Sequence, residues 1–157
     1  IIMEELVSYL IENKLKIATA ESCTGGLLAS RLTDIPGVSE VFEMGIVSYS
    51  NRIKNEFLGV KSEDLEKYGA VSEAVAKEMS KDAAKKADAD IGVGITGIAG
   101  PGGGTIKKPV GTVWLSFYFA KTDENPAYLL SLSGSRAEIR NKTCDEAVKR
   151  LKNHFNI

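Results

Sequence analysis

A run of small and polar residues, Glu21-Ser22-Cys23-Thr24-Gly25-Gly26, constrains the fold of this chain more than any other feature. The apolar stretch 15–20 before the run predicts a buried strand, and residues 27–33 after it predict a helix. A tight turn between a strand and a helix gathers a hydroxyl and several free backbone N–H groups at one place. The run therefore indicates either an anion-binding turn or a turn that exposes a serine as a nucleophile.

The rest of the chain alternates predicted strands with predicted helices. Strands are expected at 14–19, 45–50, 90–96, 111–120 and 127–132. Helices are expected near the N-terminus, at 27–33, 51–58 and 62–68, after the N-cap Ser72, and after the capping box of Ser135 and Glu138. The last two strands are close enough in sequence to form a hairpin. This order predicts a single α/β domain over residues 1–157, a three-layer α/β/α sandwich around a mixed sheet.

The bulk composition is that of an ordinary globular protein, with 43% hydrophobic and 26% charged residues. The formal net charge of -1 gives no broad attraction to nucleic acid or to an anionic membrane, so we expect neither as a partner. A small anionic ligand needs only a local pocket and stays compatible with this charge. A domain of this kind often self-associates, and we expect a homo-oligomer.

The cellular compartment and the absence of metal are also predicted from the sequence. The apolar runs are too short for a membrane-spanning helix, and the N-terminus is acidic where a signal peptide would be basic. The two distant cysteines, Cys23 and Cys144, give neither a disulfide framework nor a metal-binding spacing. We therefore expect a cytoplasmic protein with no metal site.

One literal match to the dinucleotide-binding fingerprint G-x-G-x-x-G runs from Gly92 to Gly97. That fingerprint must open a helix whose N-terminus receives the pyrophosphate. Here the match lies within a predicted strand, and the Gly- and Pro-rich run 97–104 follows it, so no helix can start there. We expect these glycines to allow close packing or the close approach of a ligand.

The choice of a general base narrows the chemistry that Ser22 could perform. The single histidine, His154, falls on the last turn of a helix, where we expect a solvated cation, so neither a Ser-His-Asp triad nor a metal centre is favoured. Lysine is the usual substitute base. Lys54 follows the second strand, near the carboxyl end where α/β sheets bind ligands, although a helical lysine is more often a solvated charge. As a base it requires its pKa to fall from about 10.4 to near neutrality, a destabilisation of the cation by about 4 kcal/mol.

Three further features leave alternatives open. Cys23 competes with Ser22 as a nucleophile, but a small core residue is the favoured interpretation, and only one of two adjacent residues is expected to face the pocket. Arg136 lies in the first turn of the last helix, where a cation is unfavourable to the helix dipole. Its presence there indicates either a bound phosphate or an ordinary contact with an acid or with solvent, and Arg140 could reinforce either. The glycine-rich loop that ends at Lys108 is either a lid or a flexible connection.

Five blocks of sequence carry a family resemblance. They are Ala20-Glu21-Ser22-Cys23-Thr24-Gly25-Gly26, Gly45-Ile46-Val47-Ser48-Tyr49-Ser50-Asn51 with Lys54, Gly69-Ala70-Val71-Ser72, Thr96-Gly97-Ile98-Ala99-Gly100-Pro101 with Gly103-Gly104, and Lys108-Pro109-Val110-Gly111-Thr112-Val113-Trp114. In this order they resemble the C-terminal domain of the competence/damage-inducible protein CinA and its stand-alone relatives, the nicotinamide-nucleotide amidases. The resemblance covers nearly the whole chain, and the long N-terminal domain of full CinA proteins has no counterpart in it.

The resemblance implies a three-layer α/β/α fold that hydrolyses nicotinamide mononucleotide to nicotinic acid mononucleotide and ammonia, with no metal or organic cofactor. The family's catalytic serine and lysine carry over to Ser22 and Lys54. Tyr49 aligns with a tyrosine near the pair, and the proton of Ser22 is expected to reach Lys54 either directly or through Tyr49. The residues expected to bind the nucleotide are Thr24, Gly25, Gly26, Thr96, Gly97, Lys108 and Arg136. Among these, backbone N–H groups around residues 24–26 would stabilise the oxyanion, and Arg136 would hold the 5′-phosphate.

One departure from the family pattern lies at the start of the last helix. Many relatives have Gly-Asp-Arg where this chain has Gly134-Ser135-Arg136, so any role of that aspartate is not carried over. Two alternatives to the amidase remain open at this point. The first is a non-catalytic regulatory or protein-binding module of the competence/damage-inducible type, and the second is an amidase that acts on another small amide.

Overall fold

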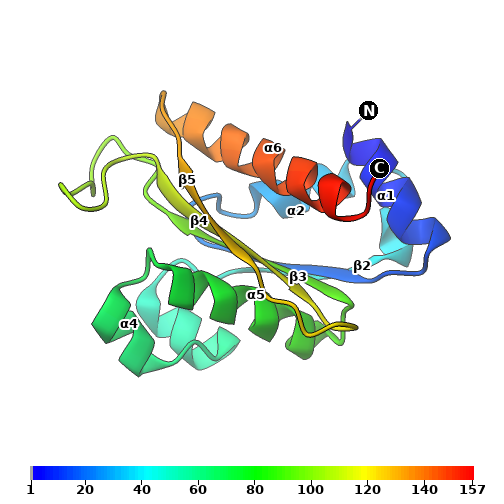
Figure 1. The fold of residues 1–157 in the computed structure, drawn as a ribbon, viewed down its shortest axis with the longest axis horizontal. Coiled ribbons are helices and arrows are strands. Elements are labelled where there is room, and N and C mark those ends of the chain that lie inside the picture. The colour runs from blue at the N-terminus through cyan, green and yellow to red at the C-terminus, as the bar shows by residue number, and fades with distance from the viewer. Residues whose placement is uncertain (1) are drawn as a thin grey trace.

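A five-stranded sheet lies at the centre of the computed structural model, which describes residues 2–157 (Figure 1). Its strands are β1 (Ile17–Glu21), β2 (Phe42–Val47), β3 (Ile91–Gly97), β4 (Thr112–Phe119) and β5 (Ala127–Ser131). They are arranged in the order β2-β1-β3-β4-β5. β1 runs parallel to β2 and β3, whereas β4 runs antiparallel to β3 and β5. The mixed sheet and the β4–β5 hairpin are therefore confirmed.

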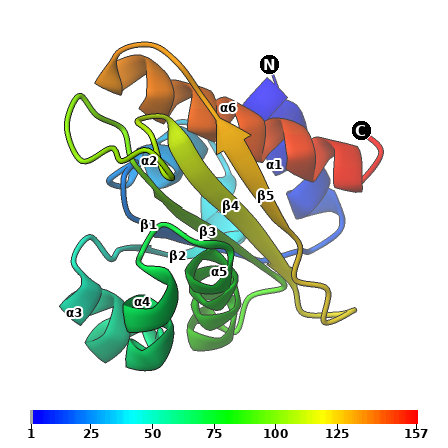
Figure 2. The same cartoon turned by 60° about the vertical axis from the view of Figure 1, so that its left-hand side comes forward.

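Helices cover both faces of the sheet (Figures 1 and 2). One face carries α1 (Ile2–Glu12), α2 (Leu27–Thr33) and α6 (Arg136–His154), and the other carries α3 (Asn51–Ile53), α4 (Ser62–Tyr68) and α5 (Glu73–Ala87). A 3-10 turn at Val38–Glu40 and a π-helical turn at Lys54–Leu58 complete the set. This arrangement confirms the three-layer α/β/α sandwich.

Two strands, β1 and β2, differ from the sequence-based expectation by more than one residue at their ends. β1 begins at Ile17 rather than at residue 14, because residues 13–15 still turn back onto α1 through backbone bonds such as Leu15 N–H to the Leu10 carbonyl. β2 spans Phe42–Val47 rather than 45–50. The chain leaves the sheet after Val47 because Ser50 caps the next helix, its hydroxyl accepting from the Ile53 N–H at 3.2 Å.

Each face of the sheet has its own apolar core. On the α6 side the core contains large side chains such as Leu10 and Phe117. On the α5 side β1 contributes the small residues Ala18 and Ala20, which pack in a cluster with Met79 of α5. The small residues on this side let α5 approach the sheet closely.

The glycines of the false dinucleotide fingerprint have a packing role. Residues 92–97 lie within β3, as expected, and no helix follows them. A Cβ added at Gly92 would lie 1.9 Å from the Ser80 carbonyl oxygen of α5, and one at Gly94 would lie 2.5 Å from that of Ala76. Both positions must be glycine because the backbone of α5 occupies the space of a side chain.

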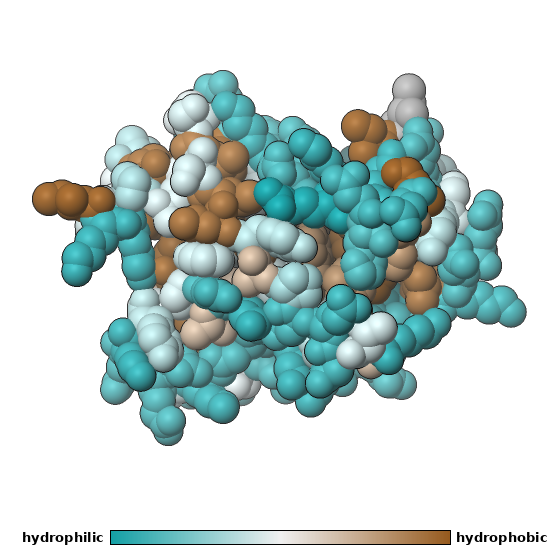
Figure 3. Space-filling view, viewed as in Figure 1, coloured by the Kyte–Doolittle hydropathy of each residue, from teal (hydrophilic) through white to brown (hydrophobic). Residues whose placement is uncertain are grey.

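On the visible face, the surface is polar over α4 and α5 in the lower part of the view, and brown apolar patches lie in the upper part (Figure 3). Exposed apolar side chains include Leu129 on the edge strand β5 and Ile106 in the loop between β3 and β4. Within residues 2–157, none of the helices has both the length and the apolar character needed to cross a membrane.

Candidate functional site

The carboxyl ends of the three parallel strands converge at one edge of the sheet. The chain passes from β1 to β2 and then crosses β1 to form β3, which creates the crevice where α/β sheets usually bind ligands. A cavity of about 270 Å³ lies there. Its lining comes from the segments after β1, β2 and β3, the α4–α5 connection and the start of α6: Ser22, Cys23, Tyr49, Asn51, Lys54, Ala70, Val71, residues 96–100, Gly102, Gly103 and Arg136.

Ser22 and Lys54 form a direct pair at the floor of this cavity. The Lys54 Nζ lies 3.1 Å from the Ser22 Oγ and donates to the Tyr49 carbonyl oxygen at 2.9 Å. Lys54 is only 1% exposed and Ser22 only 7%. Burial lowers the pKa of Lys54 below its ordinary value of 10.5, and no carboxylate of residues 2–157 forms an ion pair with it. Burial therefore shifts the equilibrium of Lys54 toward the neutral amine, the form that can accept a proton.

The backbone holds Lys54 at the first position of the π-helical turn Lys54–Leu58. Its carbonyl oxygen accepts from the N–H groups of Gly59 at 3.0 Å and Val60 at 2.9 Å. Turns of this kind are uncommon and occur frequently at functional sites. Because the turn is fixed at both ends, by the Ser50 cap and by these bonds, the lysine enters the cavity from a rigid support.

The Glu21 side chain occupies the N-terminus of α2, which limits what the turn at residues 21–26, called the serine turn below, can bind. Its carboxylate is 1% exposed and accepts from the Thr24 Oγ1 at 2.6 Å, the Leu28 N–H at 2.9 Å and the Ala29 N–H at 3.0 Å. Two backbone donors at the start of α2 are thus bonded to the chain's own carboxylate and are not available to an external anion. The N-terminus of α2 is therefore not a site for an external anion, and the turn presents Ser22 and Cys23 to the cavity.

The expected nucleotide-binding residues divide into two groups. Thr96, Gly97 and Arg136 line the cavity together with the Ser22–Lys54 pair and Tyr49. Residues 24–26 do not line it. The Gly25 N–H donates to the Ser22 carbonyl oxygen at 2.9 Å.

Lys108 also lies outside the lining of the cavity. Its Nζ donates to the Tyr68 carbonyl oxygen at 2.7 Å. This bond fastens the glycine-rich loop to the C-terminal end of α4.

Tyr49 contributes to the site through two different groups. Its backbone carbonyl contacts the Ser22–Lys54 pair, whereas its hydroxyl lies 3.2 Å from the Arg136 Nη2. The side chain is 58% exposed, so it stands at the mouth of the cavity. Arg136 also donates from Nη1 to the Gly100 carbonyl oxygen at 2.7 Å. The hydroxyl of Tyr49 is therefore engaged with the arginine and is not placed between Ser22 and Lys54.

Cys23 also lines the cavity, contrary to the expectation that only one of two adjacent residues would do so. It is 5% exposed. Burial raises the pKa of its thiol to about 11, the charge of Glu21 raises it further, and Arg140 and Arg136 oppose these effects. The group is thus a thiol rather than a reactive thiolate at neutral pH, which fits a small buried residue in the wall.

Two other parts of the lining were not singled out by sequence reasoning. Asn51 and the pair Ala70 and Val71 face the cavity. Both lie in blocks that carried the family resemblance, so the signal was present but had no assigned role.

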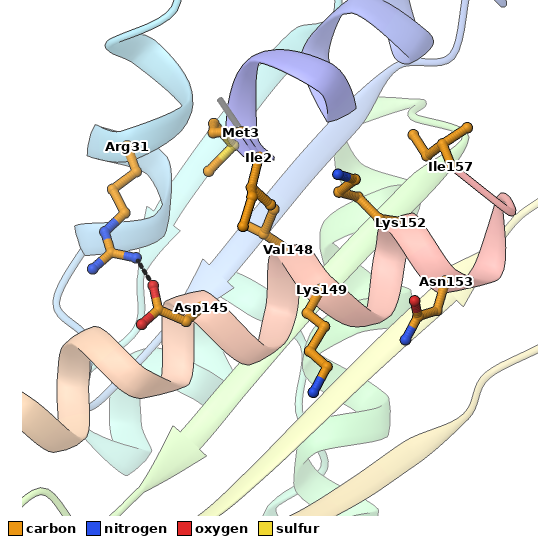
Figure 4. A pocket seen from close by; sticks show the side chains of 9 residues that line it. All are labelled: Ile2, Met3, Arg31, Asp145, Val148, Lys149, Lys152, Asn153 and Ile157. Atoms are coloured by element: carbon orange, nitrogen blue, oxygen red, sulfur yellow. Dashed lines mark hydrogen bonds and ion pairs between the residues drawn. The ribbon is translucent and has the colours of Figure 1, made fainter.

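Other chemically interesting residues lie away from this cavity. His154 ends α6, as expected, and its ring stacks on Phe119 with centroids 3.8 Å apart. A larger cavity of about 560 Å³ lies between α1, α2 and α6 (Figure 4). Its Arg31 pairs with Asp145 at 2.8 Å, and its lining has no serine, cysteine or histidine. Size alone therefore does not identify the reactive site. In the part of the chain described, no three His, Cys, Asp or Glu side chains gather as metal ligands would.

Comparison with known proteins relates the whole chain to one family. A model of the CinA C-terminal domain matches residues 1–155. A CinA-like protein of Akkermansia muciniphila is 57% identical over 114 residues, which cover 73% of this chain and 28% of the relative. A CinA-like protein of Chlorobium limicola is 48% identical over 151 residues, which cover 94% of this chain and 35% of the relative. The chain thus spans about a third of the length of these curated relatives.

Solved structures share the fold over nearly their full length. The competence/damage inducible protein CihA from Agrobacterium tumefaciens superposes with a TM-score of 0.90 at 39% identity, covering 97% of this chain and 94% of that one. The competence damage-inducible protein A (ComA) from Klebsiella pneumoniae gives a TM-score of 0.94 at 32% identity, covering 99% and 95%. The three-layer sandwich is therefore an architecture that these proteins have in common.

Proposed function

The chain belongs to the CinA C-terminal domain family, and we propose that it hydrolyses the carboxamide of nicotinamide mononucleotide to nicotinic acid mononucleotide and ammonia. The observation that carries this proposal is the buried Ser22–Lys54 pair, with its Oγ and Nζ atoms 3.1 Å apart. A buried lysine with no carboxylate partner is costly to keep charged. Such a lysine beside a serine hydroxyl is the arrangement that activates a nucleophile in the absence of a histidine.

In the first half of the reaction, neutral Lys54 takes the proton of the Ser22 hydroxyl while the Oγ attacks the carboxamide carbon. The Tyr49 carbonyl accepts one N–H of Lys54 and so holds Nζ at 3.1 Å from the Ser22 Oγ. The transfer is direct, since the Tyr49 hydroxyl is engaged with Arg136. Cys23 lines the cavity next to the nucleophile, and we assign its backbone N–H to the developing oxyanion because the Gly25 N–H is already bonded.

In the second half, protonated Lys54 gives its proton to the departing nitrogen as the C–N bond breaks, and ammonia leaves. Water then attacks the acyl-enzyme, and Lys54 accepts its proton and returns one to the Ser22 Oγ. The net reaction consumes one water and yields the pyridine carboxylic acid and ammonia. Lys54 acts as base and acid in turn, which requires a pKa near the working pH, and the lowered pKa of this buried amine supports that role.

Arg136 is the residue that we assign to the phosphate of the nucleotide. It lines the cavity at the start of α6, on the same side as the nucleophile. The capping box is formed by Ser135 and Glu138, so the helix start is intact although the family's aspartate is replaced. A guanidinium next to this helix N-terminus is suited to an oxyanion ligand.

Ammonia release from nicotinamide mononucleotide by the purified chain tests the proposal. We expect turnover in the wild type, and a loss of at least about a thousand-fold in Ser22→Ala and Lys54→Ala. Cys23→Ala serves as the matched control and should retain activity. Activity that survives in Ser22→Ala but not in Cys23→Ala would assign the nucleophile to the thiol. No ammonia from this substrate, with turnover of another small amide, would favour the alternative amidase.

The phosphate contact needs a separate measurement. Arg136→Ala should raise KM for the nucleotide by about ten-fold and leave activity on nicotinamide riboside, which lacks the phosphate, nearly unchanged. If the ratio of the two activities did not change, Arg136 would not bind the phosphate. If no amide at all were hydrolysed, the non-catalytic regulatory module would become the better interpretation.

A further inference from the structure

Arg140 makes a contact that its position on α6 alone did not indicate. Its Nη2 donates to the Thr24 carbonyl oxygen at 2.9 Å, which joins residues 116 positions apart in the chain. The guanidinium also lies over Gly25, where an added Cβ would be 3.6 Å from the same Nη2. Arg140 is half-buried and does not line the cavity, so it contacts the serine turn from outside the cavity.

The turn is anchored elsewhere by Glu21 and by the sheet. The Ser22 N–H donates to the Ile95 carbonyl of β3 at 3.0 Å, and the Glu21 carboxylate holds the Thr24 side chain and the start of α2. Between these anchors lie Gly25 and Gly26, with φ of 60° and 95°. Two adjacent glycines can adopt many other conformations, so contacts from other elements add to the local backbone bonds in fixing the shape of this segment. Arg140 supplies such a contact from another layer of the fold.

We propose that Arg140 is a positioning residue for the nucleophile: it holds the carbonyl of Thr24, whose hydroxyl is bonded to Glu21, and so keeps the Ser22 Oγ within reach of the Lys54 Nζ. This inference rests on the proposed role of Ser22 as the nucleophile. The separation of 3.1 Å between Oγ and Nζ is the geometry that must be preserved. A displacement of about 1 Å at a reacting centre can lower the rate by about a hundred-fold.

The two arginines at the start of α6 therefore have separate tasks, although they are one helical turn apart. Arg136 faces the cavity, and Arg140 faces the turn. Loss of a substrate contact raises KM, whereas loss of nucleophile positioning lowers kcat and leaves KM nearly unchanged. The kinetic signatures of the two residues are thus expected to differ.

The test compares Arg140→Gln and Arg140→Lys with the control Lys142→Gln. Lys142 also lies on α6 and donates to a backbone carbonyl, that of Ser133, but it does not contact the turn. We expect Arg140→Gln to lower kcat by at least about ten-fold with KM within about two-fold of the wild type. Arg140→Lys keeps a cation near the carbonyl and should recover part of the rate. An unchanged kcat, or a raised KM with kcat preserved, would overturn the proposal.

A second readout does not depend on the nucleotide. A fluorophosphonate probe forms a P–O bond with the Ser22 Oγ as fluoride leaves and Lys54 takes the proton, and intact mass spectrometry measures the rate. We expect this rate to fall by about the same factor as kcat in Arg140→Gln, and not in Lys142→Gln. If Arg140→Gln does not fold, as judged by thermal denaturation, an intermediate rate in Arg140→Lys is the deciding result, and a wild-type rate there contradicts the proposal.

The two proposals fail in different ways. Wild-type protein that is labelled at Ser22 but releases no ammonia from nicotinamide mononucleotide would overturn the substrate assignment, and the labelling rates of the variants would still decide the role of Arg140. Wild-type protein that is neither active nor labelled at Ser22 would contradict both, since there would be no nucleophile to position.

Discussion

Replacing Glu21 by glutamine is the most informative single perturbation of the serine turn. Glutamine keeps the size and shape of the side chain and one of its oxygens. In the wild type, Oε1 accepts from the Thr24 hydroxyl and the Leu28 N–H, and Oε2 accepts from the Ala29 N–H. In Glu21→Gln an amide NH₂ replaces one oxygen and faces a backbone donor, so at least one buried N–H loses its acceptor.

The size of the effect follows from these contacts. A buried N–H left without an acceptor costs about 1–3 kcal/mol, and loss of the negative charge at a helix N-terminus costs about 0.3–2 kcal/mol. Together we expect a loss of about 1–5 kcal/mol in the free energy of unfolding. For a domain of this length each kcal/mol corresponds to about 2–4 °C, so the Tm should fall by about 3–20 °C.

Thermal and urea denaturation of the wild type and Glu21→Gln measure this loss, and Glu138→Gln is the matched control. Glu138 is also a carboxylate at a helix N-terminus, where it accepts from the Ser135 N–H at 3.0 Å, but it is exposed. The same substitution there should cost less than about 1 kcal/mol. If Glu21→Gln lost no more stability than Glu138→Gln, the view that a buried carboxylate organises the turn would be wrong.

Three further predictions concern pH and packing. Burial holds the pKa of Lys54 below 10.5, so the free energy of unfolding should rise with pH between that lowered pKa and 10.5, and Lys54→Met should lack this rise in Tm measurements. Burial, reinforced by Asp64, raises the pKa of Glu78 from 4.5 to about 7. Stability should therefore fall as pH rises through this interval, and Glu78→Gln should have the higher Tm above pH 7 but no advantage below pH 4.5. Gly92→Ala would place a Cβ 1.9 Å from the Ser80 carbonyl oxygen and should lower the free energy of unfolding by about 3 kcal/mol or more, measured by urea denaturation.

Features that depend on neighbouring residues were predictable from the sequence. The strand, turn and helix around Ser22, the capping box at Ser135 and the hairpin of the last two strands all follow from short-range periodicity and turn chemistry. The same holds for rejection of the dinucleotide fingerprint, because the residues after Gly97 cannot begin a helix. Strand ends were less certain, since capping by Ser50 and the turn after α1 decide them.

The sequence by itself determined the residue types at the site, and only the tertiary structure decided which of them meet. Lys54 reaches Ser22 across 32 residues because β1 and β2 pair in parallel and end at the same edge of the sheet. Lys108 carries the same charge, yet it points to the end of α4. Burial, which lowers the pKa of Lys54, and the contact of Arg140 with Thr24 both depend on how separate layers pack. A local pattern contains no information on such packing, because it is set by the sum of contacts over the whole fold.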